Sequence, residues 1–342
     1  MAELPATARA PRFAGGWRIE WVERPVPRPS EGELLLAVRA NALCGTDRAQ
    51  YEQGSEVTPG HEAAGVVVAA GPGTHTSEGT PGVVYLMDFC GECRSCRLGA
   101  TNQCLAKRAD MGFDRDGGYG PYELVHESNF FPVPAELPLS EATLLLDALG
   151  TSGHALARAR SVRSDIESLL VLGAGPVGLG VVAAAHLTLP AGVPILVSDV
   201  VPERLRLAER LGARTIDLRA TELAQGVREA GLETVDLAVD GSGRRSAREA
   251  ALGILGKRGV LVCVGHGEEL LLGVSPDLIA TERSVLGSEY FRHDELPANL
   301  ELLLADRAYL GQLIGERYPV ERIGEAFESF FGGAAGKVVV EQ

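Results

Sequence analysis

The hydrophobic pattern changes near residue 165 of the 342-residue chain. Before that point, short apolar runs such as ELLLAVRA (33–40) and GVVVAA (65–70) are separated by turns rich in proline and glycine, which predicts short β-strands. Beyond it, apolar runs such as SLLVLG and PILVSD alternate with amphipathic segments such as PERLRLAERLGA. This alternation is typical of parallel strands joined by helices. The chain therefore divides into a mainly β region and an α/β region.

The C-terminal segment from residue 319 shows a third pattern, PVERIGEAFESFFGGAAGKVVVEQ. It predicts one amphipathic helix followed by a β-strand. The pattern alone assigns this segment to neither region. The total length favours roughly two domains of usual size.

Composition and charge exclude several classes of protein. With 45% hydrophobic and 23% charged residues, the chain has the composition of a globular protein. A formal net charge of −14, with no run of Lys or Arg, argues against nucleic-acid binding. The long apolar stretch 169–185 contains four glycines and a proline, so it does not predict a membrane span. The N-terminus lacks a basic segment followed by an apolar one, so we expect a cytoplasmic protein.

A glycine motif opens the α/β region. Residues Gly173–Gly178 read GAGPVG between a predicted strand and a predicted helix, where G-x-G-x-x-G accommodates the pyrophosphate of a dinucleotide. Asp199, 21 residues after Gly178, ends the next strand, where a carboxylate accepts hydrogen bonds from ribose hydroxyls. That carboxylate favours NAD over NADP. The alternative is a glycine-rich turn that binds no ligand.

Arg204 follows Asp199 by five positions. It either lies along the adenosine of the cofactor or is an exposed arginine of the predicted helix, and the sequence favours neither.

Four of the six cysteines fall within fifteen positions, with the spacing C-x2-C-x2-C-x7-C. In a reducing compartment such a cluster favours one tetrahedral zinc ion over disulfides. Four sulfur ligands leave no position for substrate, so this site is expected to be structural. The alternative is a set of unbound cysteines. The cluster consists of Cys90, Cys93, Cys96 and Cys104.

Four further residues of chemical interest are scattered along the chain: Cys44, His61, Glu62 and Asp147. Each is unremarkable alone, because a lone buried cysteine or histidine is usually structural. Spacing does not join them into one site.

Several motifs together resemble the zinc-dependent medium-chain alcohol and polyol dehydrogenases. They are CGTD (44–47), GHEAAG (60–65), the four-cysteine segment, GAGPVG with SDVVPERLRLAERLGA, and AFESFFGGAAGKVVV near the C-terminus. The resemblance covers almost the whole chain, in order, and points to the threonine, sorbitol and sugar dehydrogenase branches. It implies an α/β protein with a GroES-like, mainly β catalytic domain (1–150 and 291–342) and a doubly wound Rossmann NAD-binding domain (151–290).

The resemblance also implies roles for particular residues. Cys44 and His61 would be catalytic zinc ligands, Asp147 would fill the third protein position, and Glu62 would be a ligand or a neighbouring carboxylate. Thr46 would take the proton of the alcohol, whose oxygen zinc polarises before hydride passes to NAD. The implied cofactor contacts are Gly173, Gly175, Pro176, Val177, Gly178, Asp199, Arg204, the backbone of Val264–His266 and Ser288. With the four-cysteine site, two zinc ions per chain are expected.

The sequence departs from the family pattern in three places. Ala49 stands where many relatives carry a histidine that passes protons to water, so we expect protons to leave through Thr46, the ribose and ordered water. Only sixteen residues separate Cys44 from His61, which suggests a shortened loop and an open pocket for a bulky polyol, sugar or cyclitol. GTPGVV (79–84) replaces the usual Gly-Asp.

The sequence leaves two alternatives open. One is a zinc-free enoyl or quinone reductase on the same scaffold, although such enzymes lack Cys44, His61 and the four cysteines. The other is a non-catalytic regulator that binds NAD or zinc. VLGSEY (285–290) resembles the strand that pairs across a dimer axis in relatives, so a homodimer or homotetramer is expected. The expected partner is a small hydroxylated substrate, with no nucleic acid and no membrane.

Overall fold

The computed structural model describes residues 4–342, which form two compact units. Unit 1 contains the chain up to Leu146, Arg292–Leu303 and Ile314–Gln342. Unit 2 contains Asp147–Phe291 and Leu304–Leu313. The domain boundaries expected from the sequence stay a prediction. The first three residues, which belong to the predicted first domain and to the N-terminal segment interpreted above, lie outside the described residues.

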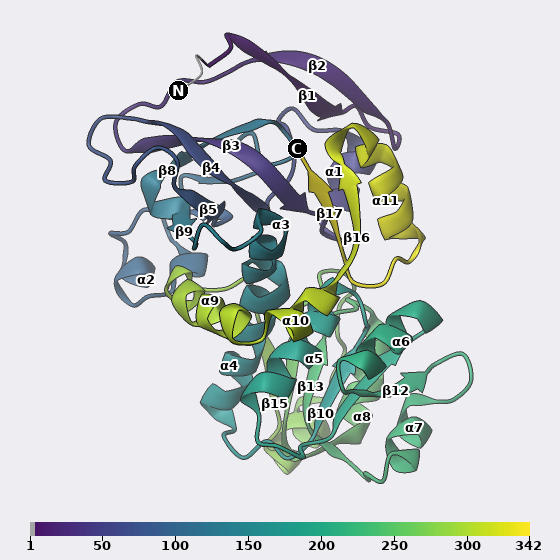
Figure 1. The fold of residues 1–342 in the computed structure, drawn as a ribbon. Helices are drawn as coiled ribbons and strands as arrows, with labels where there is room; N and C mark the ends of the chain where they lie inside the picture. Colours follow the sequence, from purple (N-terminus) through teal and green to yellow (C-terminus); the bar gives the residue numbers. More distant parts are fainter. Residues whose placement is uncertain (1–3) are drawn as a thin grey trace. The chain divides into compact units, whose positions relative to one another are not determined.

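Unit 1 is built mainly from β-strands (Figure 1). Its seven-stranded sheet has the order β16-β17-β3-β4-β5-β9, and β8 also pairs with β3. Two smaller sheets, β1-β2 and β6-β7, accompany it. The strands are β1 (Thr7–Phe13), β2 (Ile19–Pro25), β3 (Glu33–Ala42), β4 (Ala63–Ala70), β5 (Pro81–Val84), β6 (Met87–Asp88), β7 (Ala109–Asp110), β8 (Tyr122–His126), β9 (Phe130–Pro132), β16 (Ile314–Pro319) and β17 (Lys337–Glu341). The α-helices that begin in unit 1 are α1 (Asp47–Gln53), α2 (Arg94–Arg97), α3 (Leu139–Ala142), α9 (Leu296–Ala305) and α11 (Ile323–Gly332).

The C-terminal segment belongs to unit 1, a point that the sequence pattern left open. Its predicted helix and strand are α11 and β17. β17 pairs antiparallel with the end of β3, with Val339 opposite Ala42. An aromatic core that includes Phe13, Tyr119 and Phe327 packs α11 against this part of the sheet. The pairing brings the last strand of the chain beside the residues that follow β3.

Unit 2 has a six-stranded sheet, entirely parallel, in the order β12-β11-β10-β13-β14-β15. In sequence order this is 3-2-1-4-5-6, the order of a doubly wound dinucleotide-binding fold. α5 packs against α4 on one side and α6 on the other, and α7 packs against α8, so helices form two groups along the sheet. The elements are β10 (Leu169–Leu172), β11 (Ile195–Asp199), β12 (Arg214–Asp217), β13 (Val235–Asp240), β14 (Leu255–Cys263), β15 (Ser284–Gly287), α4 (Ser152–Val162), α5 (Pro176–Thr188), α6 (Pro202–Arg210), α7 (Leu223–Glu229), α8 (Arg245–Ile254) and α10 (Arg307–Leu310).

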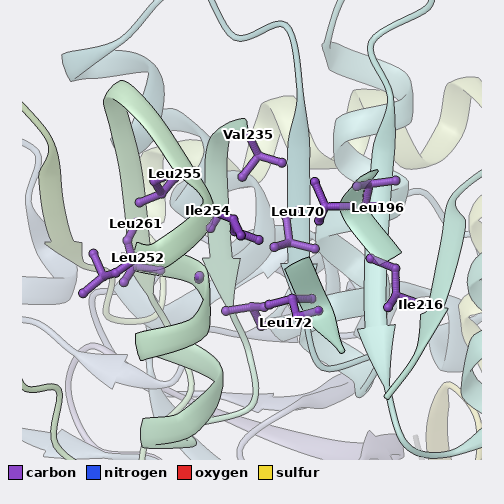
Figure 2. Packing of buried hydrophobic residues seen from close by; sticks show 13 residues of the cluster. Leu170, Leu172, Leu196, Ile216, Val235, Leu252, Ile254, Leu255 and Leu261 are labelled. Carbon is purple, nitrogen blue, oxygen red and sulfur yellow. The ribbon is translucent and has the colours of Figure 1, made fainter. Parts of the chain in front are cut away.

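The core of unit 2 explains why its strands are almost entirely apolar. Leu170, Leu196 and Leu261 of three strands pack with Leu252 and Ile254 of α8 (Figure 2). A parallel sheet covered by helices buries both faces of its strands, so their sequences show continuous apolar runs instead of alternation. The predicted α/β class, with a β-rich domain beside a Rossmann-like domain, is confirmed.

The apolar stretch 169–185 is divided between β10 and α5. Within residues 4–342, no helix is long and apolar enough to cross a membrane.

Candidate active site

Three of the scattered site residues are brought together by strand pairing in unit 1. Cys44 lies just after β3, and His61 and Glu62 lie just before β4. β3 and β4 are antiparallel neighbours, with Asn41 opposite Ala63. Because the end of one strand meets the start of the other, residues that are distant in sequence lie close together.

Asp147 completes the cluster. It begins a π-helical turn, Asp147–Thr151, directly after Leu146, and the Thr151 hydroxyl donates to its Oδ1 at 3.3 Å. Single π-helical turns occur frequently at functional sites. One potential ligand atom from each of Cys44, His61, Glu62 and Asp147 lies within 4.8 Å of all the others. The fold thus gathers the four residues that spacing alone could not join.

His61 is oriented by a buried acid. The Asp47 carboxylate lies 3.4 Å from Nδ1 of His61 through Oδ1, and its Oδ2 accepts hydrogen bonds from Tyr119 (2.6 Å) and from the backbone N–H of Cys44 (3.0 Å). Burial and the charge of Asp47 raise the pKa of Tyr119 well above its usual value, so the phenol remains a proton donor. Because Nδ1 faces Asp47, Nε2 is the nitrogen placed to bind a metal.

Glu62 forms a buried ion pair with Lys337, the first residue of β17. The two side chains are at most 1% exposed, and Nζ of Lys337 also donates to the Leu43 carbonyl at 3.4 Å. Two opposite charges in such an environment compensate each other, whereas either one alone would be costly. The pair supplies a reason for Glu62 to remain ionised without binding a metal.

The donor set fits zinc. A thiolate, an imidazole and a carboxylate from Cys44, His61 and Asp147 are common ligands of catalytic zinc sites, which use three protein ligands. The thiolate and the carboxylate together balance the two positive charges of the ion. Since Lys337 already neutralises Glu62, the charges of the whole cluster balance with Glu62 outside the coordination sphere.

The four-cysteine segment has a different geometry. Its Sγ atoms lie 3.5–4.0 Å apart, between Cys93 and Cys96 (3.5 Å), Cys90 and Cys104 (3.5 Å), Cys93 and Cys104 (3.9 Å), and Cys90 and Cys96 (4.0 Å). A disulfide bond is about 2.05 Å long, and all these cysteines are free thiols. A tetrahedral zinc ion with Zn–S bonds of about 2.3 Å requires sulfur separations of about 3.8 Å. The four sulfurs therefore fit one zinc ion.

The backbone of this segment supports a negative charge on Cys93. The N–H groups of Cys96 and Leu105 donate to Sγ of Cys93 at 3.5 and 3.4 Å. These hydrogen bonds lower the pKa of the Cys93 thiol to about 6. The thiolate is the form that binds metal. Cys93 is thus favoured as a thiolate, whereas burial and the neighbouring thiols raise the pKa of Cys96 to about 12.

The glycine motif lies where the sequence predicted it, between β10 and α5. A Cβ atom on Gly178 would lie 1.9 Å from the Gly173 carbonyl oxygen, so helix and strand approach too closely for any side chain. At Gly175, by contrast, an added Cβ would have no described protein atom within 4 Å. Gly178 thus allows close packing of helix and strand, while Gly175 leaves the start of α5 open to a ligand. Pro176 and Val177 form the first turn of that helix.

Asp199 ends β11 and is nearly buried. Its Oδ2 accepts from the N–H of Ala174, inside the glycine motif, at 2.6 Å, and its Oδ1 accepts from Val200 and Val201 at 2.6 and 2.8 Å. These bonds fix the carboxylate beside the glycine motif, and Oδ2, which accepts one of the three, keeps a second lone pair for a ligand hydroxyl. Asp199 and the glycine motif, which are more than twenty residues apart in the sequence, are therefore in direct contact.

The remaining predicted residues lie at the ends of strands or helices. Val264 and His266 follow β14, Ser288 follows β15, and Arg204 lies in α6. His266 is exposed, 3.6 Å from Glu289. Thr46 precedes α1 with an exposed side chain, and its hydroxyl does not cap the helix.

Sequence reasoning missed the supporting residues Asp47, Tyr119 and Lys337. Asp47 is part of the quoted CGTD motif, so its position near Cys44 was a usable signal. Tyr119 and Lys337 are separated from their partners by 72 and 275 residues, and no spacing rule connects such distances. A lysine at the start of the apolar run KVVV was the one visible clue to a buried cation.

Comparisons with known proteins agree with this geometry. Residues 30–135 match the family model "Alcohol dehydrogenase GroES-like domain", and residues 176–305 match "Zinc-binding dehydrogenase". A zinc-type alcohol dehydrogenase-like protein of Escherichia coli, YphC, is 29% identical, and the alignment covers 98% of both chains. An L-threonine 3-dehydrogenase of Shewanella frigidimarina is 28% identical over 93% of this chain and 95% of its own.

Solved structures share the whole fold. Acetophenone reductase of Geotrichum candidum, in complex with NAD, is 25% identical with a TM-score of 0.86, covering 100% of this chain and 99% of its own. Proteins of this fold have been solved with either NAD or NADP. The two family models together span more than half of the chain, in the order of its two units. The chain belongs to the family of zinc-dependent medium-chain alcohol and polyol dehydrogenases, oxidoreductases that act on CH–OH groups.

Proposed function

We propose that this protein oxidises a primary or secondary alcohol of a small hydroxylated molecule to the carbonyl, reversibly, with NAD and a catalytic zinc ion. The observation that carries the proposal is the cluster of Cys44, His61, Glu62 and Asp147, in which one potential ligand atom from each lies within 4.8 Å of the others. The substrate class comprises polyols, sugars, cyclitols and amino alcohols. Relatives named for L-threonine and L-galactonate act on substrates of this kind.

Cys44, His61 and Asp147 would hold the catalytic zinc. When bound, zinc acts as a Lewis acid on the substrate oxygen, and the nicotinamide ring accepts the hydride. Asp47 fixes the ring of His61, and Lys337 keeps the charge of Glu62 compensated. Glu62 is then a neighbouring carboxylate and Asp147 the resting third ligand. The four sulfurs of Cys90, Cys93, Cys96 and Cys104 would hold a second, structural zinc.

Thr46 is the proposed first acceptor of the alcohol proton. Its hydroxyl does not cap α1 and its side chain is exposed, so it remains available to a substrate. Ala49, in the same helix, has no titratable side chain that could take the proton from there. The proton would therefore continue through the cofactor ribose and water. Ala49→His is expected to raise turnover at low pH, and no change would count against a limitation by proton release.

NAD is proposed over NADP because of Asp199. Its carboxylate is fixed beside the glycine motif and would accept hydrogen bonds from the ribose hydroxyls, whereas the extra phosphate of NADP would be repelled. The N–H groups at the start of α5 would bind the pyrophosphate. Arg204, Val264, His266 and Ser288 are proposed further contacts of the cofactor. Asp199→Ala should narrow the preference for NAD over NADP by at least about ten-fold in kcat/KM.

A homodimer or homotetramer is proposed from the sheet of unit 2. β15 is the last strand of that sheet, and an edge strand offers backbone groups for pairing with a second copy. Exposed Leu271, Val274 and Ile279 lie shortly before it in the chain. Light scattering in solution tests this proposal. A cytoplasmic location remains a proposal as well.

The decisive test is a substrate screen. Purified protein with NAD is incubated with polyols, sugars, cyclitols and amino alcohols, and NADH formation is followed at 340 nm. We expect turnover with at least one class, lost in Cys44→Ser and retained in Cys263→Ser, whose cysteine lies outside both clusters. NADH formation that survives Cys44→Ser would contradict the proposed zinc site.

A further inference from the structure

Three loops meet at the carboxyl edge of the sheet in unit 2. The first is the glycine motif after β10, the second the turn 240–243 after β13, and the third the loop 264–268 after β14. A Cβ on Gly173 would lie 3.2 Å from Cβ of Ser242, and one on Gly243 would lie 2.1 Å from the His266 carbonyl oxygen. The backbones of successive loops are therefore in direct contact, in the order of their strands.

Arg248 of α8 braces the third loop from inside the unit. It is only 7% exposed. Its guanidinium donates to the carbonyls of Gly265 (2.5 Å) and Glu268, on the two sides of His266. The planar fork of an arginine suits such a double contact, which a lysine ammonium does not reproduce.

Asp240 joins this brace to the second loop. Its Oδ2 accepts from Nε of Arg248 at 2.6 Å, while its Oδ1 accepts from the N–H groups of Ser242 (2.8 Å) and Gly243 (3.2 Å). Its own carbonyl accepts from Val264 and Gly265 at 2.9 and 2.8 Å. One fully buried carboxylate and one arginine thus fix two adjacent loops to each other.

We infer that the Asp240–Arg248 pair positions the nicotinamide half of the bound dinucleotide by holding the loop 264–268 against the turn 240–243. The inference rests on the proposed function. In a doubly wound sheet a dinucleotide lies across the carboxyl edge at the point where strand order reverses, here between β10 and β13. The glycine motif and Asp199 serve the adenosine and pyrophosphate on the β10 side. The loops after β13 and β14 therefore lie on the side of the other half.

The pair acts by fixing the conformation of the loop 264–268, without contacting the cofactor itself. Neither side chain needs to reach the ligand, because Gly265 and Glu268 are held by their carbonyls. A loop that is already fixed loses less conformational entropy when a ligand binds. Releasing the loop should therefore weaken binding of the nicotinamide portion and leave binding of the ADP-ribose portion unchanged.

The test compares two ligands in fluorescence or calorimetric titrations: NADH, and ADP-ribose, which lacks the nicotinamide ring. Arg248→Met is expected to raise the Kd for NADH by about ten-fold. The same variant should change the Kd for ADP-ribose by less than about two-fold. Arg248→Lys, which keeps the charge beside Asp240 but cannot reach both carbonyls, should show a smaller change of the same kind. Ser246→Ala, on the same helix with an exposed side chain, is the control and should bind both ligands normally.

The outcomes separate the two claims. Wild-type protein that binds no NADH would overturn both the proposed function and this inference. Wild-type binding combined with an unchanged Kd for NADH in the variants, or with equal weakening of NADH and ADP-ribose, would overturn the inference alone. If Arg248→Met does not fold, the Kd values of Arg248→Lys for NADH and ADP-ribose decide the question.

Discussion

The two cysteine-containing clusters are assembled over very different distances along the chain. Cys90, Cys93, Cys96 and Cys104 fall within fifteen positions, and their sulfurs are surrounded by backbone N–H groups of the same segment. The other cluster draws on positions 44, 61, 62 and 147, and its supporting contacts come from as far away as residue 337. The first is a local structure, and the second depends on the completed fold.

The two clusters also differ in the chemistry of their potential metal ligands. Four thiolates would close a tetrahedral zinc site, so we expect the local cluster to stabilise its segment and to bind no substrate. The distant cluster combines a thiolate, an imidazole and carboxylates, and the neighbours of His61 and Glu62 fix their orientation or balance their charge. We expect substitutions in the local cluster to affect stability more than catalysis, and substitutions in the distant cluster to affect catalysis most.

The largest expected effect is on activity in the distant cluster. Cys44→Ser should lower kcat/KM by about a thousand-fold, because stabilisation of charge by a bound metal is worth several kcal/mol. The free energy of unfolding should change little. Steady-state kinetics and thermal unfolding of the same preparation measure both. A variant that loses stability and keeps its activity would reverse the roles given to the two clusters.

Lys337→Met should be the most damaging change to stability. It leaves the buried charge of Glu62 without its partner, and breaking a buried ion pair costs about 3–5 kcal/mol. Denaturant unfolding measures the loss. The double variant Glu62→Gln with Lys337→Met removes both charges and should recover most of it, while Lys337→Arg keeps the pair. A double variant as unstable as the single one would mean that packing, and not charge, explains the effect.

Cys93→Ser should destabilise the local cluster. A zinc ion held by four cysteines binds the folded segment and not the unfolded one, so its binding stabilises the fold, and we expect its loss to cost about 2–4 kcal/mol. Limited proteolysis should cut first near 90–104. The kcat/KM of the folded fraction should stay within about ten-fold of wild type, because no substrate position is open at four sulfur ligands. A collapse of activity at full stability would show that this cluster takes part in catalysis.

The smallest effect concerns Glu123, a buried acid without the support that Glu62 receives. It is fully buried in β8, and among the described residues neither of its carboxylate oxygens has a hydrogen-bond partner. Burial, with a contribution from Asp116, raises the pKa of Glu123 well above its usual value, although His61 acts in the opposite direction. The folded protein thus binds this proton more tightly than the unfolded chain does.

The sign of the pH effect follows from that difference. Stability should be highest below the ordinary glutamate pKa and should fall as the pH rises through the raised pKa of Glu123. Glu123→Met should therefore gain about 1–3 kcal/mol at pH 8 and less at pH 4.5. Chemical unfolding at the two pH values tests this. An equal gain at both values would remove ionisation of Glu123 as the cause.

The same contrast shows what the sequence could predict. Apolar runs that alternate with amphipathic segments predicted the parallel sheet. Gly173–Gly178 with Asp199 predicted a dinucleotide site, which stays a prediction, and the structure adds a hydrogen bond from Ala174 to Asp199 that the sequence did not predict. The four-cysteine cluster could be interpreted because its geometry is local. The cluster around Cys44 needed a family resemblance, since strand pairing and not spacing brings its members together. The ion pair of Glu62 with Lys337 had no sequence signal of comparable strength, because 275 residues separate the partners.

The most direct test of two separate zinc sites is the zinc content per chain, measured by plasma mass spectrometry on three purified proteins. We predict two zinc ions in the wild type, and one each in Cys44→Ser and Cys93→Ser. One ion in the wild type, or loss of both ions from either variant, would contradict two independent sites.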